Sequence, residues 1–269
     1  MSNDTVSSVY VGIGGWNFEP WRGTFYPDGL TQKRELEYAA RHVTSIEING
    51  TYYGPQKPET FAKWHDEAPE SFLFSVKAPR IATNRKVLAE AGSSIERFLT
   101  GGVLELKDKL GPINWQFMPT KKFDPVDFEA FLKLLPKRLN GRDIRHVVEV
   151  RHESFSNAEF VAMVREYGVA VVITDKLDFP QIADLTAPFV YLRLMASRES
   201  EPSGYSSGEI NLWVKRAQEW CAGGDVADLR HASDKPPVKL AVRDVFVYFI
   251  SGFKVRNPAA AMEFIKRHS

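Results

Sequence analysis

Carboxylates, cations and aromatic residues recur just after the short apolar runs of this sequence, and they are its candidates for chemistry. The candidate proton donors or acceptors are Glu47, Glu149 and Asp175. The candidate ligand-binding residues are Trp16, Asn49, Tyr52, Lys77, Gln116, Arg151, His152 and Arg193. A carboxylate can serve as general acid or base, and Lys and Arg hold carboxylate or phosphate groups. We therefore expect a small anionic or phosphorylated ligand, with Lys77, Arg151 and Arg193 holding the anion and Glu47 or Glu149 moving a proton.

The segment 77–89 adds a second basic feature. It contains Lys77, Arg80, Arg85 and Lys86 and no acidic residue. With the aromatic residues that follow the first two apolar runs, it leaves a second hypothesis open: a nucleic-acid-binding or nuclease-like protein whose aromatic rings stack bases and whose cations contact phosphates. A solvated loop is the alternative interpretation of the same segment.

Cofactor motifs are scarce. Glu47, Glu149, Asp175 and His152 could together bind a divalent metal ion, but no H-E-x-x-H or C-x-x-C spacing supports such a site. Cys221 is the single cysteine, so it can form neither an internal disulfide nor a thiolate metal cage. There is no G-x-S-x-G elbow and no phosphate-binding loop. We predict no metal site, and the cofactor stays unknown.

The elements that must position these residues alternate between strand and helix. Strands are expected at Val9–Ile13, Ser45–Ile48, Phe72–Val76, Pro112–Phe117, His146–Val150, Val169–Thr174, Phe189–Leu194 and Val245–Ile250. Helical periodicity appears in between, with a kink at Gly101-Gly102 and only a short turn or helix between the sixth and seventh strands. Eight such units in about 250 residues predict an α/β fold, a single (β/α)8 TIM-type barrel. A doubly wound open sheet is the alternative, but this sequence lacks the phosphate-binding fingerprint that usually follows the first strand of such a sheet.

In such a barrel the C-terminal strand ends carry the active site, and the candidate residues stand at those ends. We expect one barrel domain over 9–269, after a flexible N-terminus, 1–8, that is not a secretory signal. No apolar run is long enough to span a membrane, and the net charge is +1. The expected location is cytoplasmic, and the balanced charge argues against a surface that binds polyanions as a whole.

Several motifs together resemble the family of domain of unknown function 72, also called YecE-like. They are the residues 14–27 (GGWNFEPWRGTFYP), 46–53 (IEINGTYY), 74–79 (FSVKAP), 110–117 (LGPINWQF) and 148–155 (VEVRHESF). The resemblance implies a TIM-type barrel and supplies no reaction.

Two positions depart from the pattern of that family. Its members usually carry Y-x-R-x-H-G at the seventh strand, where this chain has Met195-Ala196 after Tyr191 and Arg193. A pair of asparagines at the eighth strand is replaced by Ile250-Ser251. These departures leave a third hypothesis, a non-catalytic binding barrel, and the oligomeric state stays open.

Overall fold

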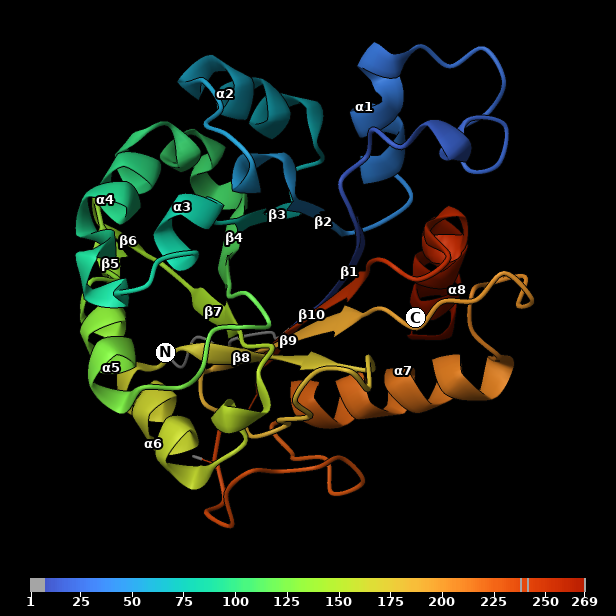
Figure 1. The fold of residues 1–269 in the computed structure, drawn as a ribbon. Helices are drawn as coiled ribbons and strands as arrows, with labels where there is room; N and C mark the ends of the chain where they lie inside the picture. The colour runs from blue at the N-terminus through green and yellow to red at the C-terminus, as the bar shows by residue number, and fades with distance from the viewer. Residues whose placement is uncertain (1–7, 238, 241, 269) are drawn as a thin grey trace, which may run out of the picture.

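The computed structural model describes residues 8–237, 239–240 and 242–268, and eight parallel strands form a closed barrel within it (Figure 1). The strands are β1 (Val9–Gly14), β2 (Ser45–Ile48), β3 (Leu73–Lys77), β4 (Leu110–Gln116), β7 (His146–Glu149), β8 (Ala170–Thr174), β9 (Phe189–Leu194) and β10 (Asp244–Phe249). Their order around the barrel is β1-β10-β9-β8-β7-β4-β3-β2, so the first strand pairs with the last. The predicted TIM-type fold is confirmed.

Helices connect most of the strands and surround the barrel (Figure 1). They are α1 (Glu35–Ala40), α2 (Pro58–Glu67), α3 (Arg80–Thr83), α4 (Gly92–Thr100), α5 (Pro125–Lys133), α6 (Ala158–Tyr167), α7 (Ser207–Cys221) and α8 (Asn257–His268). Between β8 and β9 the chain makes only a turn, as expected. None of the helices in the described ranges is long and apolar enough to cross a bilayer.

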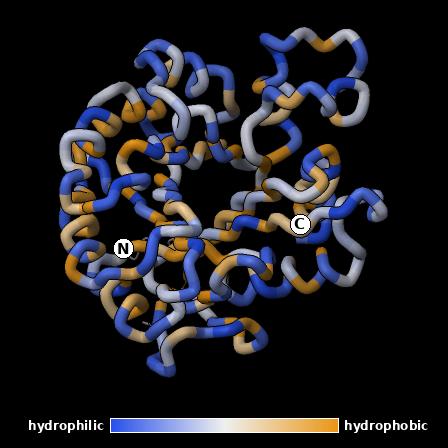
Figure 2. The backbone as a smooth tube through the Cα atoms, viewed as in Figure 1, coloured by the Kyte–Doolittle hydropathy of each residue, from blue (hydrophilic) through white to orange (hydrophobic). Residues whose placement is uncertain are grey.

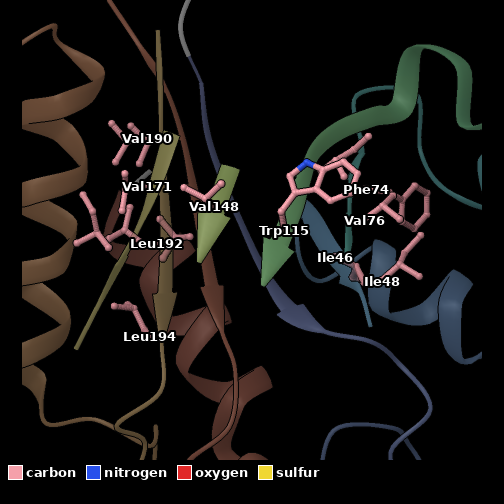
Figure 3. Close-up of a cluster of buried hydrophobic side chains, with 14 of the residues drawn as sticks. Ile46, Ile48, Phe74, Val76, Trp115, Val148, Val171, Val190, Leu192 and Leu194 are labelled. Carbon is pink, nitrogen blue, oxygen red and sulfur yellow. The ribbon is translucent and has the colours of Figure 1, made fainter. Parts of the chain in front are cut away.

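Side chains alternate between the two faces of the barrel wall, and this alternation creates two apolar layers. The outward side chains, among them Trp115, Val148 and Leu192, pack between strands and helices (Figure 3). The inward side chains include Tyr10, Phe246 and Tyr248 and fill the barrel interior on the side away from the C-terminal strand ends. Figure 2 shows the same division, with hydrophobic stretches along the strands and hydrophilic ones in the outer loops.

The predicted kink lies at the end of α4. The helix ends at Thr100, and a 3-10 segment, η5 (Val103–Lys109), follows. Gly102 adopts φ +118°, and a Cβ atom there would stand 2.7 Å from the Cα of Pro58 at the start of α2. Only glycine allows this backbone conformation and this close approach between the two elements.

Two local features differ from the expectation. The segment 77–89 is not one loop, because α3 and the 3-10 turn η4 (Leu88–Ala91) lie within it or begin there. A small hairpin of β5 (Arg138–Leu139) and β6 (Arg142–Asp143) precedes β7 and was not predicted. Of the expected flexible segment 1–8, residues 1–7 lie outside the described residues.

Candidate functional site

One arginine joins two of the carboxylates proposed for proton transfer. Glu47 lies near the end of β2, Glu149 at the end of β7, and Arg193 near the end of β9. Arg193 donates from Nη2 to Glu47 Oε1 at 3.0 Å and from Nη1 to Glu149 Oε2 at 2.5 Å. All three side chains are at most 3% exposed. Buried charges are tolerated when they are paired in this way, so the three form one ionic layer across the barrel.

Neutral polar groups complete this layer. Tyr191 donates its hydroxyl hydrogen to Glu47 Oε2 at 2.6 Å. The Nδ2 of Asn114 lies 3.4 Å from a carboxylate oxygen of each glutamate. Together these groups give the two carboxylates hydrogen bonds beyond the ion pairs, which a buried charge requires.

A second arginine extends the network toward the surface. Arg151 donates from Nε to Glu149 Oε1 at 2.8 Å and from Nη2 to Gln116 Oε1 at 2.7 Å. Its guanidinium also lies 4.6 Å from the ring centroid of Phe179. Gln116 in turn donates to the hydroxyl of Tyr52 at 3.4 Å. Arg151 is 19% exposed, so this chain of contacts leads from the buried layer to the barrel mouth.

Lys77, the last residue of β3, is the cation of the site without a carboxylate partner. The ammonium lies 4.1 Å from the ring centroid of Tyr52, and among the described residues it forms no ion pair. The residue is 7% exposed. Arg193 and Arg151 are matched by Glu47 and Glu149, so Lys77 leaves this cluster with one net positive charge.

The pKa values reflect this arrangement. Burial alone would raise the pKa of Glu149, but Arg193, Arg151 and Lys77 outweigh it and hold that pKa below the ordinary value. Burial and the neighbouring charge of Arg193 lower the pKa of Lys77 to about 8, against a smaller opposing effect of Glu47. Glu149 is thus kept ionised, and Lys77 can lose a proton near pH 8.

Trp16 and Asn49 line a separate pocket beside the mouth. Its volume is about 330 Å³, and the other lining residues are Gly14, Gly15, Asn17, Ile48, Gly50, Gln56, Trp64 and Lys254. Trp16 packs edge-on against Trp64, with ring centroids 5.1 Å apart. The side-chain amide of Asn49 donates to the carbonyl oxygen of Glu47 at 3.2 Å. Two predicted binding residues therefore lie next to the ionic layer and outside it.

Asp175 and His152 make contacts of a different kind. Asp175 accepts hydrogen bonds from the backbone N–H groups of Met195 and Ala196 and, at 2.8 Å, from the hydroxyl of Tyr205. Burial raises its pKa. The Nδ1 of His152 accepts from the backbone N–H of Ser154 at 3.1 Å. Neither side chain is hydrogen-bonded to the ionic layer, and both hold a loop in the structure.

At the two positions expected to depart from the family pattern, part of the barrel mouth is apolar. Met195 and Ile250 are buried, and Ile250 belongs to the inward apolar cluster. The carbonyl oxygen of Ser251 accepts from Ser197 at 3.2 Å and from Asn257 at 3.1 Å, which ties the ends of β9 and β10 together. The polar groups of the mouth therefore come from β2, β3, β4, β7 and β9.

The divalent metal ion that the sequence left possible receives no support from the donor set. Within residues 8–237, 239–240 and 242–268, no group of three His, Cys, Asp or Glu side chains is arranged to hold a metal ion. The guanidinium of Arg193 fills the space between Glu47 and Glu149, where a cation bound by both would lie.

The prediction missed Ser75, Asn114 and Tyr191. The hydroxyls of Ser75 and Tyr191 are hydrogen-bonded to each other at 2.6 Å, and Tyr191 in turn contacts Glu47. The signal was present in the sequence, because each of the three stands two residues before a predicted site residue of the same strand: Lys77, Gln116 or Arg193. Residues two apart in a strand share a face, so these positions also face inward.

Eight parallel strands, their connecting helices and polar groups gathered at the C-terminal strand ends define a TIM-type barrel protein. The chain belongs to the DUF72 family of proteins of unknown function, whose family model matches residues 10–269.

Three comparisons illustrate this relationship. The protein is 30% identical over 150 residues to the UPF0759 protein YecE of Escherichia coli K12, a match that spans 55% of this chain and 50% of YecE. A DUF72 family protein from Thermotoga maritima has a similar structure, with a TM-score of 0.73, 24% identity and coverage of 96% of this chain and 98% of that one. D-psicose 3-epimerase shares the fold at 12% identity and a TM-score of 0.51, with coverage of 93% and 89%. The last two likenesses are of fold alone.

Proposed function

We propose that this protein binds a small anionic ligand at the C-terminal mouth of its barrel and that Lys77 is the main anion-binding group. The observation that carries the proposal is the missing carboxylate partner of the buried Lys77 ammonium. A carboxylate, phosphate or sulfate group beside this ammonium would supply the missing charge. Burying an unpaired charge is costly, so a ligand that pairs it gains that free energy on binding.

Arg151 supplies the second contact. Its Nη2 and Nε are held by Glu149 and Gln116, which fix the plane of the guanidinium at the edge of the mouth. A planar guanidinium held in place can bind a carboxylate or phosphate with little loss of side-chain entropy. Arg193 pairs with both glutamates in the buried layer, so we assign it to positioning them.

For a transformation of the ligand we propose Glu149 as general base rather than general acid, because neighbouring cations keep it ionised. Glu47 is the alternative base. We assign Asp175 a positioning role, since its oxygens hold the loop that starts at Met195.

Sulfate is a suitable first probe, because its charge does not change between pH 7 and pH 9. A bound anion stabilises the protonated Lys77, so we expect the affinity for sulfate to fall about tenfold between these pH values. In the variant Lys77→Met the affinity at pH 7 should fall to the level of the wild type at pH 9 or below. Isothermal titration calorimetry measures both effects.

Lys86→Met is the matched control, because Lys86 is an exposed cation of the same basic segment. It should leave sulfate binding unchanged. Equal affinity at both pH values together with no effect of Lys77→Met would refute the proposal. A single-stranded oligonucleotide that binds more tightly than sulfate and loses affinity in Lys86→Met would favour the nucleic-acid hypothesis instead.

A further inference from the structure

A second pocket lies between the β2–α2 loop, α2, α3 and α4. Figure 1 shows these helices on one flank of the barrel. Its volume is about 370 Å³, within the range of sites for small molecules. The walls are mainly apolar and include Tyr52, Tyr53, Phe61, Ile81 and Phe98. We propose that this pocket binds a small amphipathic anion, with an aromatic or branched apolar body inside and a carboxylate or similar group outside.

The floor of the pocket is fixed by packing. Phe61 is 2% exposed and packs edge-on against Trp64, with ring centroids 5.3 Å apart. Phe98 lies edge-on to Trp115 on the barrel wall, with ring centroids 6.1 Å apart. Rings held by the outer apolar layer form a preorganised surface, and binding to such a surface requires little ordering of side chains.

The outer wall is unusually exposed for its side-chain types. Tyr53 is 72% exposed and Ile81 is 60% exposed, and both line this pocket. Exposed apolar side chains that gather around one concave site mark a binding surface more often than single ones do. An apolar body placed in the pocket would cover both side chains.

Charge determines which kind of molecule fits. Two arginines, Arg80 and Arg97, line the pocket, and the described lining residues contain no aspartate or glutamate. Within the described ranges neither guanidinium is paired with a carboxylate, and Arg80 lies 5.8 Å from the ring centroid of Tyr53. Their positive charge complements an anionic head group at the rim.

The pocket and the barrel mouth share one wall. Tyr52 is part of the pocket lining, and the same residue contacts Lys77 and Gln116 at the mouth. The charged groups of the two sites are nevertheless different residues. This inference therefore does not depend on the anion site proposed at Lys77, and each can be tested without the other.

A matched pair of probes isolates the role of charge. 1-Naphthaleneacetate is anionic, and 2-(1-naphthyl)ethanol has the same ring and no charge. We expect saturation-transfer NMR and calorimetry to show binding of the acid that is about tenfold or more tighter than that of the alcohol, the factor typical of one charge-assisted contact. Equal binding of the two probes, or no binding of the acid at millimolar concentration, would overturn the proposal.

Variants locate the binding. Arg97→Gln should weaken the acid about tenfold and the alcohol less than about twofold, since only the acid carries a charge for this arginine to pair with. Ile81→Glu should weaken the acid at least as much, because it adds a like charge to the wall. Ile81 is exposed, so this substitution leaves folding intact.

Three controls complete the design. Val126→Glu places a glutamate at an even more exposed apolar position on α5, outside the pocket, and Arg142→Gln removes an exposed arginine of the β5–β6 hairpin. Both should leave the affinity for the acid unchanged. Lys77→Met should change the affinity for the acid by less than about twofold, because the charged groups of the two sites are different residues. Loss of binding in Lys77→Met with no change in Arg97→Gln would place the acid at the barrel mouth and refute the second site.

Discussion

Arg193 Nη2 and Glu47 Oε1 lie 3.0 Å apart inside the barrel, although 146 residues separate them in the sequence. Neither side chain is more than 3% exposed. The pair connects β9 to β2, two strands that are not neighbours in the sheet, across the barrel interior. The ionic layer therefore couples opposite walls of the barrel as well as forming the floor of the mouth.

We predict that Arg193→Met lowers the free energy of unfolding by about 3–5 kcal/mol, because it leaves two buried carboxylates without their shared cation. Urea denaturation at pH 7 measures the loss. Arg34→Met, which removes an exposed ion pair with Glu37, should cost less than about 1 kcal/mol. A loss of the same small size for Arg193→Met would contradict the ionic layer, and adding Glu47→Gln and Glu149→Gln to that variant should restore part of the stability.

Lys77 should make the stability depend on pH above neutrality. Its pKa is about 8 in the folded protein and close to the ordinary 10.5 when unfolded, so between these values the unfolded chain binds more protons. Stability then rises with pH over that window, by up to about 3 kcal/mol. Urea titrations at pH 7.5, 8.5 and 9.5 cover part of this window and should show a contribution of about 2 kcal/mol in the wild type that is absent in Lys77→Met. Parallel pH profiles for the two proteins would show that Lys77 is not desolvated.

His146 should act in the acid range, and there too the stability should fall as the pH falls. Trp115 donates to its Nδ1 at 3.0 Å, and its Nε2 is 2.9 Å from the carbonyl oxygen of Pro136, which fixes the neutral ring. Burial lowers its pKa from 6.5 to about 4. As the pH falls from 6.5 toward 4, the unfolded chain binds the proton first, and stability should decrease by about 2 kcal/mol by pH 5.

Two measurements check this expectation for His146. Histidine NMR should show an imidazole that stays neutral down to pH 5. Urea denaturation of His146→Gln should show a weaker dependence between pH 6.5 and 5 than the wild type does. An imidazole of His146 that titrates near 6.5 would contradict the buried, hydrogen-bonded geometry.

Asp175→Asn separates a positioning role from a catalytic one. The amide keeps one acceptor oxygen and loses the other, so one or more of the hydrogen bonds from Met195, Ala196 and Tyr205 is lost. We expect a loss of about 1–3 kcal/mol in stability and faster hydrogen exchange at the two backbone amides. Asp178→Asn, at an 83% exposed position, should change neither. Unaltered stability and exchange in Asp175→Asn would return Asp175 to the candidates for catalysis.

The barrel could be predicted from the sequence because each strand is a short β-branched or aromatic run and the helices between them have a clear period. The β5–β6 hairpin was missed since its strands are two residues long, too short for any alternation. The dipeptide Asn140-Gly141 was its available signal: both residues adopt positive φ, +49° and +80°, as a tight hairpin turn requires.

The site was predicted in part for a similar physical reason. Residues that face inward near a strand end, such as Glu47 and Lys77, follow from strand position alone. The contacts of Asp175 depend on how the loop after β9 folds back, and no local pattern encodes that path. The pocket between α2, α3 and α4 likewise arises from how three consecutive helices pack against one another, so its lining could not be predicted from the spacing of residues.

The pairing of β1 with β10 also bears on the order in which the protein can form during synthesis. β1 is made first, but its partner along one edge, residues 244–249, is made after every other strand. Until then the nascent sheet has two open edges, and open strand edges are templates for wrong association. Closure of the barrel is therefore a late event, and the growing chain keeps two open strand edges until its last strand has been made.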